Sequence, residues 1–143
     1  MIAVDAGVFL ALADRSDAWH ASARAALPTL DEGWITTWPV LTEAVHLLRV
    51  RLDQKAAVEL LQDAADGGFE LWTPTPQALA AIPALMRKYA SLPMDLADAS
   101  LVLLAEQLGH GRVLSTDLRD FGAYRWKARK PFRNLLETPP SLR

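Results

Sequence analysis

Four acidic residues stand where a carboxylate could act on a ligand. Asp5 closes a short apolar run, and Asp117 follows another one. Asp98 heads a long apolar segment, and Glu43 lies among apolar residues of a predicted helix. An unpaired charge in apolar surroundings is costly, and no basic residue lies close in sequence to Asp5, Glu43 or Asp98. We therefore expect a distant partner or a bound cation at these residues.

Carboxylates without cysteine form an oxygen-only ligand set, which selects Mg²⁺ or Mn²⁺ rather than Zn²⁺. A carboxylate-held Mg²⁺ keeps several waters, and it can neutralise charge that develops on a phosphate. Each acid also has a simpler explanation. Asp95 is best explained as a helix N-cap, and Asp98 would suit the dipole of the same helix. Asp5 and Asp117 could be loop ends, and Glu43 a solvated helix residue.

Short apolar runs alternate with helical segments along the chain, and this alternation must position the acids. We predict strands at Met1–Val4, Trp34–Thr37, Phe69–Trp72, Arg112–Ser115 and around Phe132–Leu136. The predicted helices are Gly7–Ala13, Ala18–Leu27, Pro39–Leu52, Gln54–Asp66, Pro76–Tyr89 and Leu96–Leu108. This order predicts an α/β fold, a three-layer α/β/α sandwich around a mainly parallel sheet of about four to five short strands. Ligands of such sheets bind at the carboxyl ends of the strands, where Asp5 and Asp117 would lie.

Length and composition limit the possible classes of protein. The 143 residues fit one domain, 1–143, and a chain with 51% apolar and 22% charged residues is expected to fold around a core. The absence of cysteine excludes disulfides, thiolate nucleophiles and cysteine zinc sites. No apolar run approaches the roughly 20 residues of a transmembrane span, and Asp5 interrupts any secretory signal. We expect no membrane partner.

The net charge of −2 conceals two oppositely charged parts. Residues 1–117 hold 8 basic and 15 acidic residues, whereas the basic C-terminal segment 118–143 holds 7 and 2. That segment interleaves Trp126 and Phe132 with five candidate RNA-binding residues: Arg125, Lys127, Arg129, Lys130 and Arg133. Cations can hold phosphates and aromatic rings can stack on bases. For the two aromatic residues we favour packing on the core.

The ordered motifs resemble those of PIN-domain ribonucleases of the VapC toxin type. The matching pieces span nearly the whole chain and are Ile2–Asp5, Phe9-Leu10, Thr42-Glu43, Met94–Ala99 and Ser115–Phe121. The resemblance implies a PIN-like fold and an acidic quartet formed by Asp5, Glu43, Asp98 and Asp117. It also implies that Thr116 supports the quartet, whereas Asp95 falls where the family varies.

The resemblance implies a Mg²⁺-dependent endoribonuclease that acts as the toxin of a toxin–antitoxin pair, with Mn²⁺ as a substitute ion. We assign direct metal contact to Asp5 and Asp98. Glu43 and Asp117 would orient the attacking water or bind a second ion. The implied partners are an RNA substrate, a cognate antitoxin protein and a second copy in a homodimer. A cytoplasmic location is expected.

Two other classes stay open at this point. A phosphatase on a similar sheet would place Asp-x-Asp after the first strand, where the chain has Asp5-Ala6-Gly7, and a phosphoreceiver would place its Asp after the third, where Trp72-Thr73-Pro74 stands. A non-catalytic RNA- or protein-binding module would use the basic C-terminal segment, and it would not need all four acids. Metal-dependent cleavage of RNA separates these hypotheses.

Overall fold

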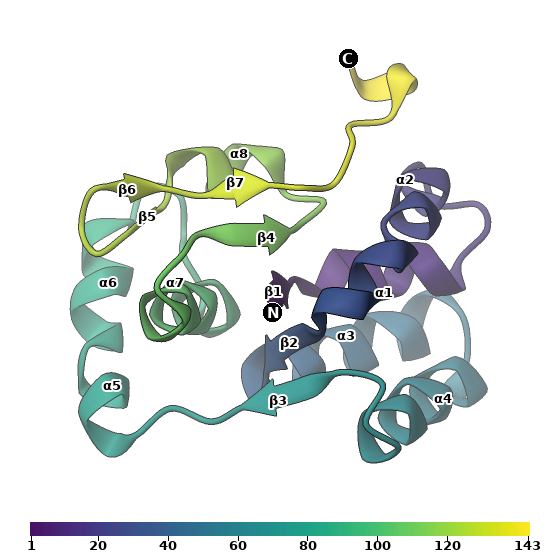
Figure 1. The fold of residues 1–143 in the computed structure, drawn as a ribbon, viewed down its shortest axis with the longest axis horizontal. Coiled ribbons are helices and arrows are strands. Elements are labelled where there is room, and N and C mark those ends of the chain that lie inside the picture. Colours follow the sequence, from purple (N-terminus) through teal and green to yellow (C-terminus); the bar gives the residue numbers. More distant parts are fainter.

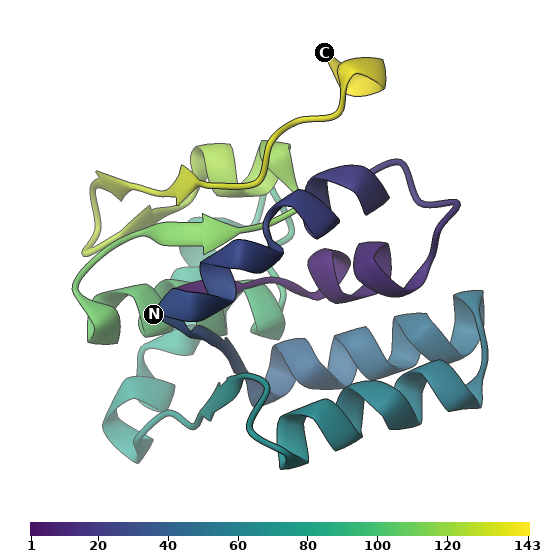
Figure 2. The same cartoon turned by 45° about the vertical axis from the view of Figure 1, so that its right-hand side comes forward.

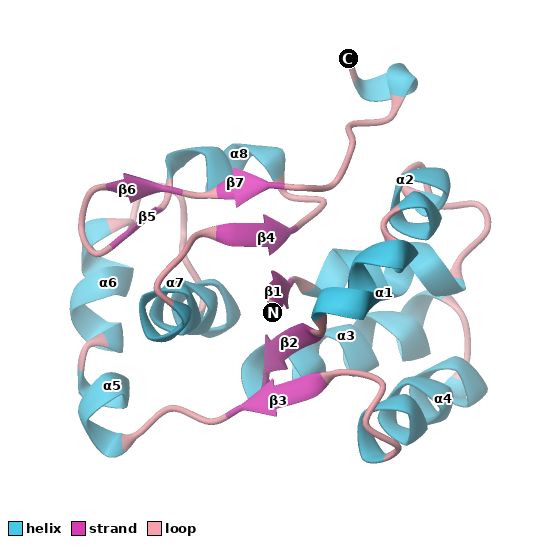
Figure 3. Ribbon diagram, in the orientation of Figure 1, coloured by secondary structure: helices cyan, strands magenta, loops and turns pink.

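The computed structural model describes residues 1–143 and has a five-stranded parallel sheet between two layers of helices (Figures 1 and 3). The strands lie in the order β3-β2-β1-β4-β7, and every neighbouring pair is parallel. Their bounds are β1 Ile2–Val4, β2 Trp34–Thr37, β3 Glu70–Trp72, β4 Arg112–Leu114 and β7 Arg133–Asn134. The predicted α/β/α sandwich with a mainly parallel sheet is confirmed.

Helices cover both faces of the sheet. On one side lie α1 (Ala6–Ala13), α2 (His20–Ala25) and α4 (Gln54–Ala65), and on the other α5 (Pro76–Ala80), α6 (Ile82–Lys88) and α7 (Leu96–Leu108) (Figure 1). Helix α3 (Trp38–Arg51) packs against α1, α4 and α7, and its close pairing with α4 is visible in Figure 2. Short 3₁₀ helices span Leu27–Glu32 and Pro140–Leu142. None of the helices has the length and apolar character that crossing a membrane requires.

Most of the α-helices begin with a capping side chain. The side chain of each cap accepts a backbone N–H from the first turn, which satisfies one of the donors that a helix start leaves free. The capping residues are Asp5 for α1, Thr37 for α3, Asp53 for α4, Thr75 for α5, Asp95 for α7 and Asp117 for α8 (Leu118–Ala123). Behind these turns, 36 buried apolar residues form one continuous core.

The largest differences between the structure and the sequence predictions lie in two places. The single helix predicted over Pro76–Tyr89 is two helices, because Pro83 lacks the N–H that a continuous helix needs and lies in the first turn of α6 instead. In the C-terminal segment we predicted one strand. The structure there has α8, a hairpin of β5 (Arg125–Trp126) and β6 (Lys130–Pro131), and then β7. The hairpin turns at Lys127 and Ala128, both with positive φ, which their residue types do not announce.

Candidate active site

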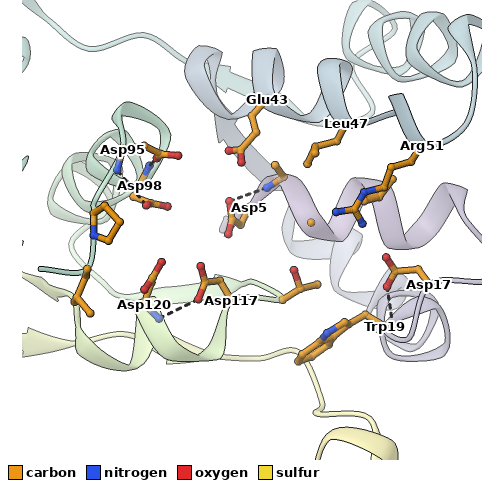
Figure 4. A pocket seen from close by; sticks show the side chains of 16 residues that line it. Asp5, Asp17, Trp19, Glu43, Leu47, Arg51, Asp95, Asp98, Asp117 and Asp120 are labelled. Carbon is orange, nitrogen blue, oxygen red and sulfur yellow. Dashed lines mark hydrogen bonds between the residues drawn. The ribbon is translucent and has the colours of Figure 1, made fainter. Parts of the chain in front are cut away.

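A cavity of about 420 Å³ opens at the carboxyl ends of the central strands (Figure 4). Asp5 follows β1 and Asp117 follows β4, and the backbone N–H of Asp5 donates to the carbonyl of Leu114 at 2.9 Å. The parallel pairing of β1 with β4 thus places both acids at one edge of the sheet. Helices bring the remaining acids, so that seven carboxylates line the cavity: Asp5, Asp17, Glu43, Asp95, Asp98, Asp117 and Asp120.

Asp5 is the most deeply buried of these acids, at 8% exposure. Its Oδ1 accepts the N–H of Ala6 at 2.7 Å, and its Oδ2 accepts the hydroxyl of Ser115 at 2.8 Å. Burial raises the pKa of Asp5 from 3.8 to about 6, even though both hydrogen bonds lower it. Both carboxylate oxygens are therefore held in fixed directions, and the negative charge has no nearby cation to offset the loss of water.

Ser115 connects Asp5 to Asp117, which the sequence analysis did not foresee. The Ser115 hydroxyl donates to Asp5 and accepts the N–H of Asp117 at 2.9 Å. Thr116, the hydroxyl that the resemblance implied, also lines the cavity, but its side chain faces Gly7, where an added Cβ would collide with it. Of the two neighbouring hydroxyls, it is thus that of Ser115, and not that of Thr116, that touches a quartet carboxylate.

Asp98 is held by its own helix and by Tyr124. Asp95 and Asp98 form a capping box: Asp95 Oδ1 accepts the N–H of Asp98 at 2.8 Å, and Asp98 Oδ2 accepts the N–H of Asp95 at 3.3 Å. The buried hydroxyl of Tyr124 donates to the same Oδ2 at 3.0 Å. Burial and the charge of Asp95 raise the pKa of Asp98 to about 7. These contacts leave Oδ1 of Asp98 without a hydrogen bond, so it is free to bind a ligand.

Glu43 reaches the cavity from the second turn of α3, which begins at Trp38 after the Thr37 cap and has Pro39 in its first turn. Its carboxylate is partly buried and makes no hydrogen bond. Burial and the charge of Asp5 raise the pKa of Glu43 to about 7. A carboxylate with these properties can accept a proton near neutral pH.

Asp120, which lies within the motif Ser115–Phe121, is a further cavity acid, and no function was predicted for it. Asp117 caps α8 by accepting the N–H of Asp120 at 2.9 Å, so the two side chains share the first helical turn. Desolvation and the contact with Asp117 raise the pKa of Asp120 to about 6. The spacing of three residues after a capping Asp was the signal that could have identified it.

The cavity acids have no basic partner within ion-pair distance. The three salt bridges of the structure join Lys55 to Glu59, Arg112 to Glu32 and Arg143 to Glu137. No group of three or more His, Cys, Asp or Glu side chains is arranged to hold a metal ion directly. Mg²⁺ is usually held through only one or two carboxylates with waters at its other positions, so the oxygen-only donor set fits that ion.

The five predicted RNA-binding cations do not line this cavity. The guanidinium of Arg125 donates to the carbonyls of Gly122, Ala123 and Tyr124, so it closes the C-terminal end of α8. The other four, Lys127, Arg129, Lys130 and Arg133, are exposed. Lys127 and Lys130 flank the ring of Trp126, which is buried at 8% exposure as predicted.

Comparison with known proteins assigns the family. The profile of the PIN domain matches residues 2–127. A Mycobacterium tuberculosis protein named Ribonuclease VapC26 is 25% identical over 122 residues, which are 85% of this chain and 90% of that protein. The crystal structure of M. tuberculosis VapC20, described as a sarcin–ricin loop cleaving toxin, superposes with a TM-score of 0.80 at 21% identity and covers 92% of this chain and all of that one. The chain therefore belongs to the PIN domain family, in agreement with the resemblance drawn from its motifs.

Proposed function

We propose that the protein is a Mg²⁺-dependent endoribonuclease and the toxin of a toxin–antitoxin pair. The observation that carries this proposal is the meeting of Asp5, Glu43, Asp98 and Asp117 in one cavity without a basic partner. Membership of the PIN family and the similarity to proteins named as a ribonuclease and as an RNA-cleaving toxin support it.

In this proposal Asp5 and Asp98 hold the ion, with Mn²⁺ as a substitute. When bound, Mg²⁺ supplies a Lewis acid that activates water and offsets the charge developing on the phosphate. Ser115 keeps Asp5 in position and Tyr124 keeps Asp98 in position through their hydroxyl hydrogen bonds. Glu43, with no hydrogen-bond partner, orients the water and accepts its proton, and Asp117 orients the same water from the opposite wall.

RNA cleavage with and without chelator tests the proposal. We expect fluorescently labelled RNA, including a hairpin with the sarcin–ricin loop sequence, to be cut in Mg²⁺ or Mn²⁺, poorly in Zn²⁺ and not in EDTA. Asp5→Asn should abolish cleavage. Asp53→Asn is the matched control, because Asp53 also caps a helix but lies outside the cavity. Full activity in EDTA, or full activity of Asp5→Asn, would refute the proposed chemistry.

The antitoxin and the homodimer are part of the same proposal. An antitoxin segment that carries a basic residue would offset the uncompensated acids of the cavity. Trp38 and Leu96, 52% and 47% exposed, line one shallow apolar hollow, a surface that a second copy could cover. Co-purification with the product of the neighbouring gene and light scattering of the isolated protein test the two partners. A monomer at high concentration would exclude the homodimer.

A further inference from the structure

One cavity residue differs in charge from the others. Arg51 is the only Lys or Arg among the residues that line the cavity, which also carries seven carboxylates. Glu43, Leu47 and Arg51 follow one another at four-residue intervals on α3, so they share one helix face. At 1.5 Å per residue, Glu43 and Arg51 are about 12 Å apart along the helix axis. Arg51 therefore lies at the far end of the cavity from the proposed metal site.

Arg51 is free to bind a ligand. Its side chain is exposed and forms no hydrogen bond or salt bridge. Its charge is near enough to Asp14 to contribute to lowering the pKa of that carboxyl, but the two side chains form no ion pair. Figure 4 shows Asp17 on the opposite wall, but that carboxylate accepts the N–H of Trp19 at 2.8 Å and forms no ion pair with Arg51. Leu47 lies between Glu43 and Arg51 on α3, and buried Trp19 also lines the cavity, next to Asp17 (Figure 4).

The end of α3 does not explain why a cation points into the cavity. A basic residue in the last helical turn suits the helix dipole, and α3 has two there, Arg49 and Arg51. Arg49 is equally exposed and does not line the cavity. Arg49 alone would supply the positive charge that stabilises the helix dipole. The position of Arg51 in the cavity is therefore not needed for the helix, and its side chain can serve a ligand.

We infer that Arg51 binds a backbone phosphate of the RNA strand other than the one that is cleaved. This inference rests on the proposed function. A polyanion that enters a cavity with seven carboxylates is repelled except where a cation offsets them. The metal site would supply one such position, and Arg51 supplies the second one about 12 Å along α3. With two phosphates held this far apart, the nucleotides between them lie along the stretch of α3 that carries Leu47, and the strand is fixed in register.

Steady-state kinetics with Arg51→Gln test this inference, and Arg49→Gln is the matched control. We expect the KM of a long RNA to rise about 10-fold in Arg51→Gln, as for the loss of one charged hydrogen bond, with kcat nearly unchanged. Arg49→Gln should behave as wild type, and Arg51→Lys should recover part of the loss. A KM of Arg51→Gln equal to that of wild type, or an equal effect of Arg49→Gln, would overturn the inference.

Substrate length provides the sharper test. In oligonucleotides shortened step by step from either end, the difference in KM between wild type and Arg51→Gln should vanish once the strand no longer reaches Arg51. A difference that persists with the shortest cleaved substrate would show that Arg51 acts on the cleaved phosphate or on the fold, and would overturn the inference.

A binding measurement separates this inference from the proposed function. In the Asp98→Asn background, fluorescence anisotropy should show that Arg51→Gln weakens RNA binding and reduces the salt slope by about 0.7, as expected for one phosphate of a single strand. Unchanged binding would overturn the inference. Absence of cleavage by wild type on every RNA would overturn the proposed function instead, and the binding result would still decide about Arg51.

Discussion

Asp98→Asn should leave the metal-free protein at least as stable as wild type, and its relative stability should increase with pH. Burial and the neighbouring charge of Asp95 raise the pKa of Asp98 from 3.8 to about 7. The folded state therefore binds the proton more tightly than the unfolded chain does. The stability that the protonated carboxyl contributes is fully present below pH 3.8 and is lost as the pH rises through about 7. Asparagine does not titrate, so Asp98→Asn does not lose stability at this position as the pH rises.

The size of this effect follows from the surroundings of Asp98. A change in pKa from 3.8 to about 7 corresponds to an upper limit of about 4 kcal/mol. Because Asp98 is partly exposed and solvent screens its charge, we expect about 1–2 kcal/mol. Asparagine still accepts from Tyr124 and from the N–H of Asp95, and it loses a helix-dipole contribution of roughly 0.3–1 kcal/mol. The net gain at pH 8 is therefore about 1 kcal/mol.

Thermal melts in EDTA at pH 5 and pH 8 measure this effect. Only about 0.6 of the total is lost between pH 5 and pH 8, because the part between pH 3.8 and pH 5 is already gone. The melting temperature of Asp98→Asn should therefore rise relative to wild type by about 1–5 °C between the two pH values, at roughly 2–4 °C per kcal/mol. Asp53→Asn, a change in a helix cap outside the cavity, should show no such relative increase. If Asp98→Asn melts far below wild type at pH 8, the carboxylate stabilises the fold and the reasoning is refuted.

The same melts with Mg²⁺ test ligation. At a hundredfold excess over Kd, Mg²⁺ should stabilise wild type by about 2.7 kcal/mol. Asp98→Asn should gain much less, because one carboxylate ligand is replaced by a neutral amide. An equal response of both proteins to Mg²⁺ would show that Asp98 is not a ligand.

Two further predictions concern the Tyr124 hydroxyl that donates to Asp98 and the exposed hairpin of β5 and β6. Tyr124→Phe should raise the Mg²⁺ concentration needed for half-maximal stabilisation, because Asp98 loses the donor at 3.0 Å. Tyr89→Phe is the control and should leave that concentration unchanged, because the hydroxyl it removes accepts only from a backbone N–H. Equal effects of the two variants would contradict this prediction. Alanine at both Arg129 and Lys130 should flatten the salt dependence of RNA binding by up to ~1.4 and leave Mg²⁺ stabilisation intact. An unchanged slope would place the hairpin outside the RNA interface.

Much of the fold could be predicted because local chemistry fixes it. The bounds of Trp34–Thr37 and Leu96–Leu108 agree with β2 and α7, since a Thr or Asp cap, a proline or a terminal glycine limits each segment. Pro83 was overlooked as a helix break, although its chemistry is equally local. The hairpin in the basic segment depends instead on tertiary contacts: the backbone N–H of Lys127 donates to Glu106 Oε1 at 3.1 Å, and Lys88 Nζ donates to the carbonyl of Ala128 at 3.1 Å.

The meeting of the acids could be predicted, whereas the contacts that orient them could not. Parallel strands end at one edge, so Asp5 and Asp117 had to lie near each other once the sheet was expected. The hydroxyls of Ser115 and Tyr124 reach their carboxylates from 110 and 26 residues away in sequence. Nothing in the local pattern distinguishes Ser115 from Thr116, because only the direction of each side chain decides which one touches Asp5.

The distribution of cations explains why the cavity needs an external positive charge. Arg112 is paired with Glu32, and Arg125 is occupied by the carbonyls at the end of α8. The exposed cations of the basic segment lie outside the cavity, and beyond about 10 Å of solvent their field is largely screened at 0.1 M salt. Within the cavity only Arg51 opposes seven carboxylates. Under the proposed function, the exposed cations of the basic segment would attract RNA first, and the acids of the cavity would be neutralised by a bound ion.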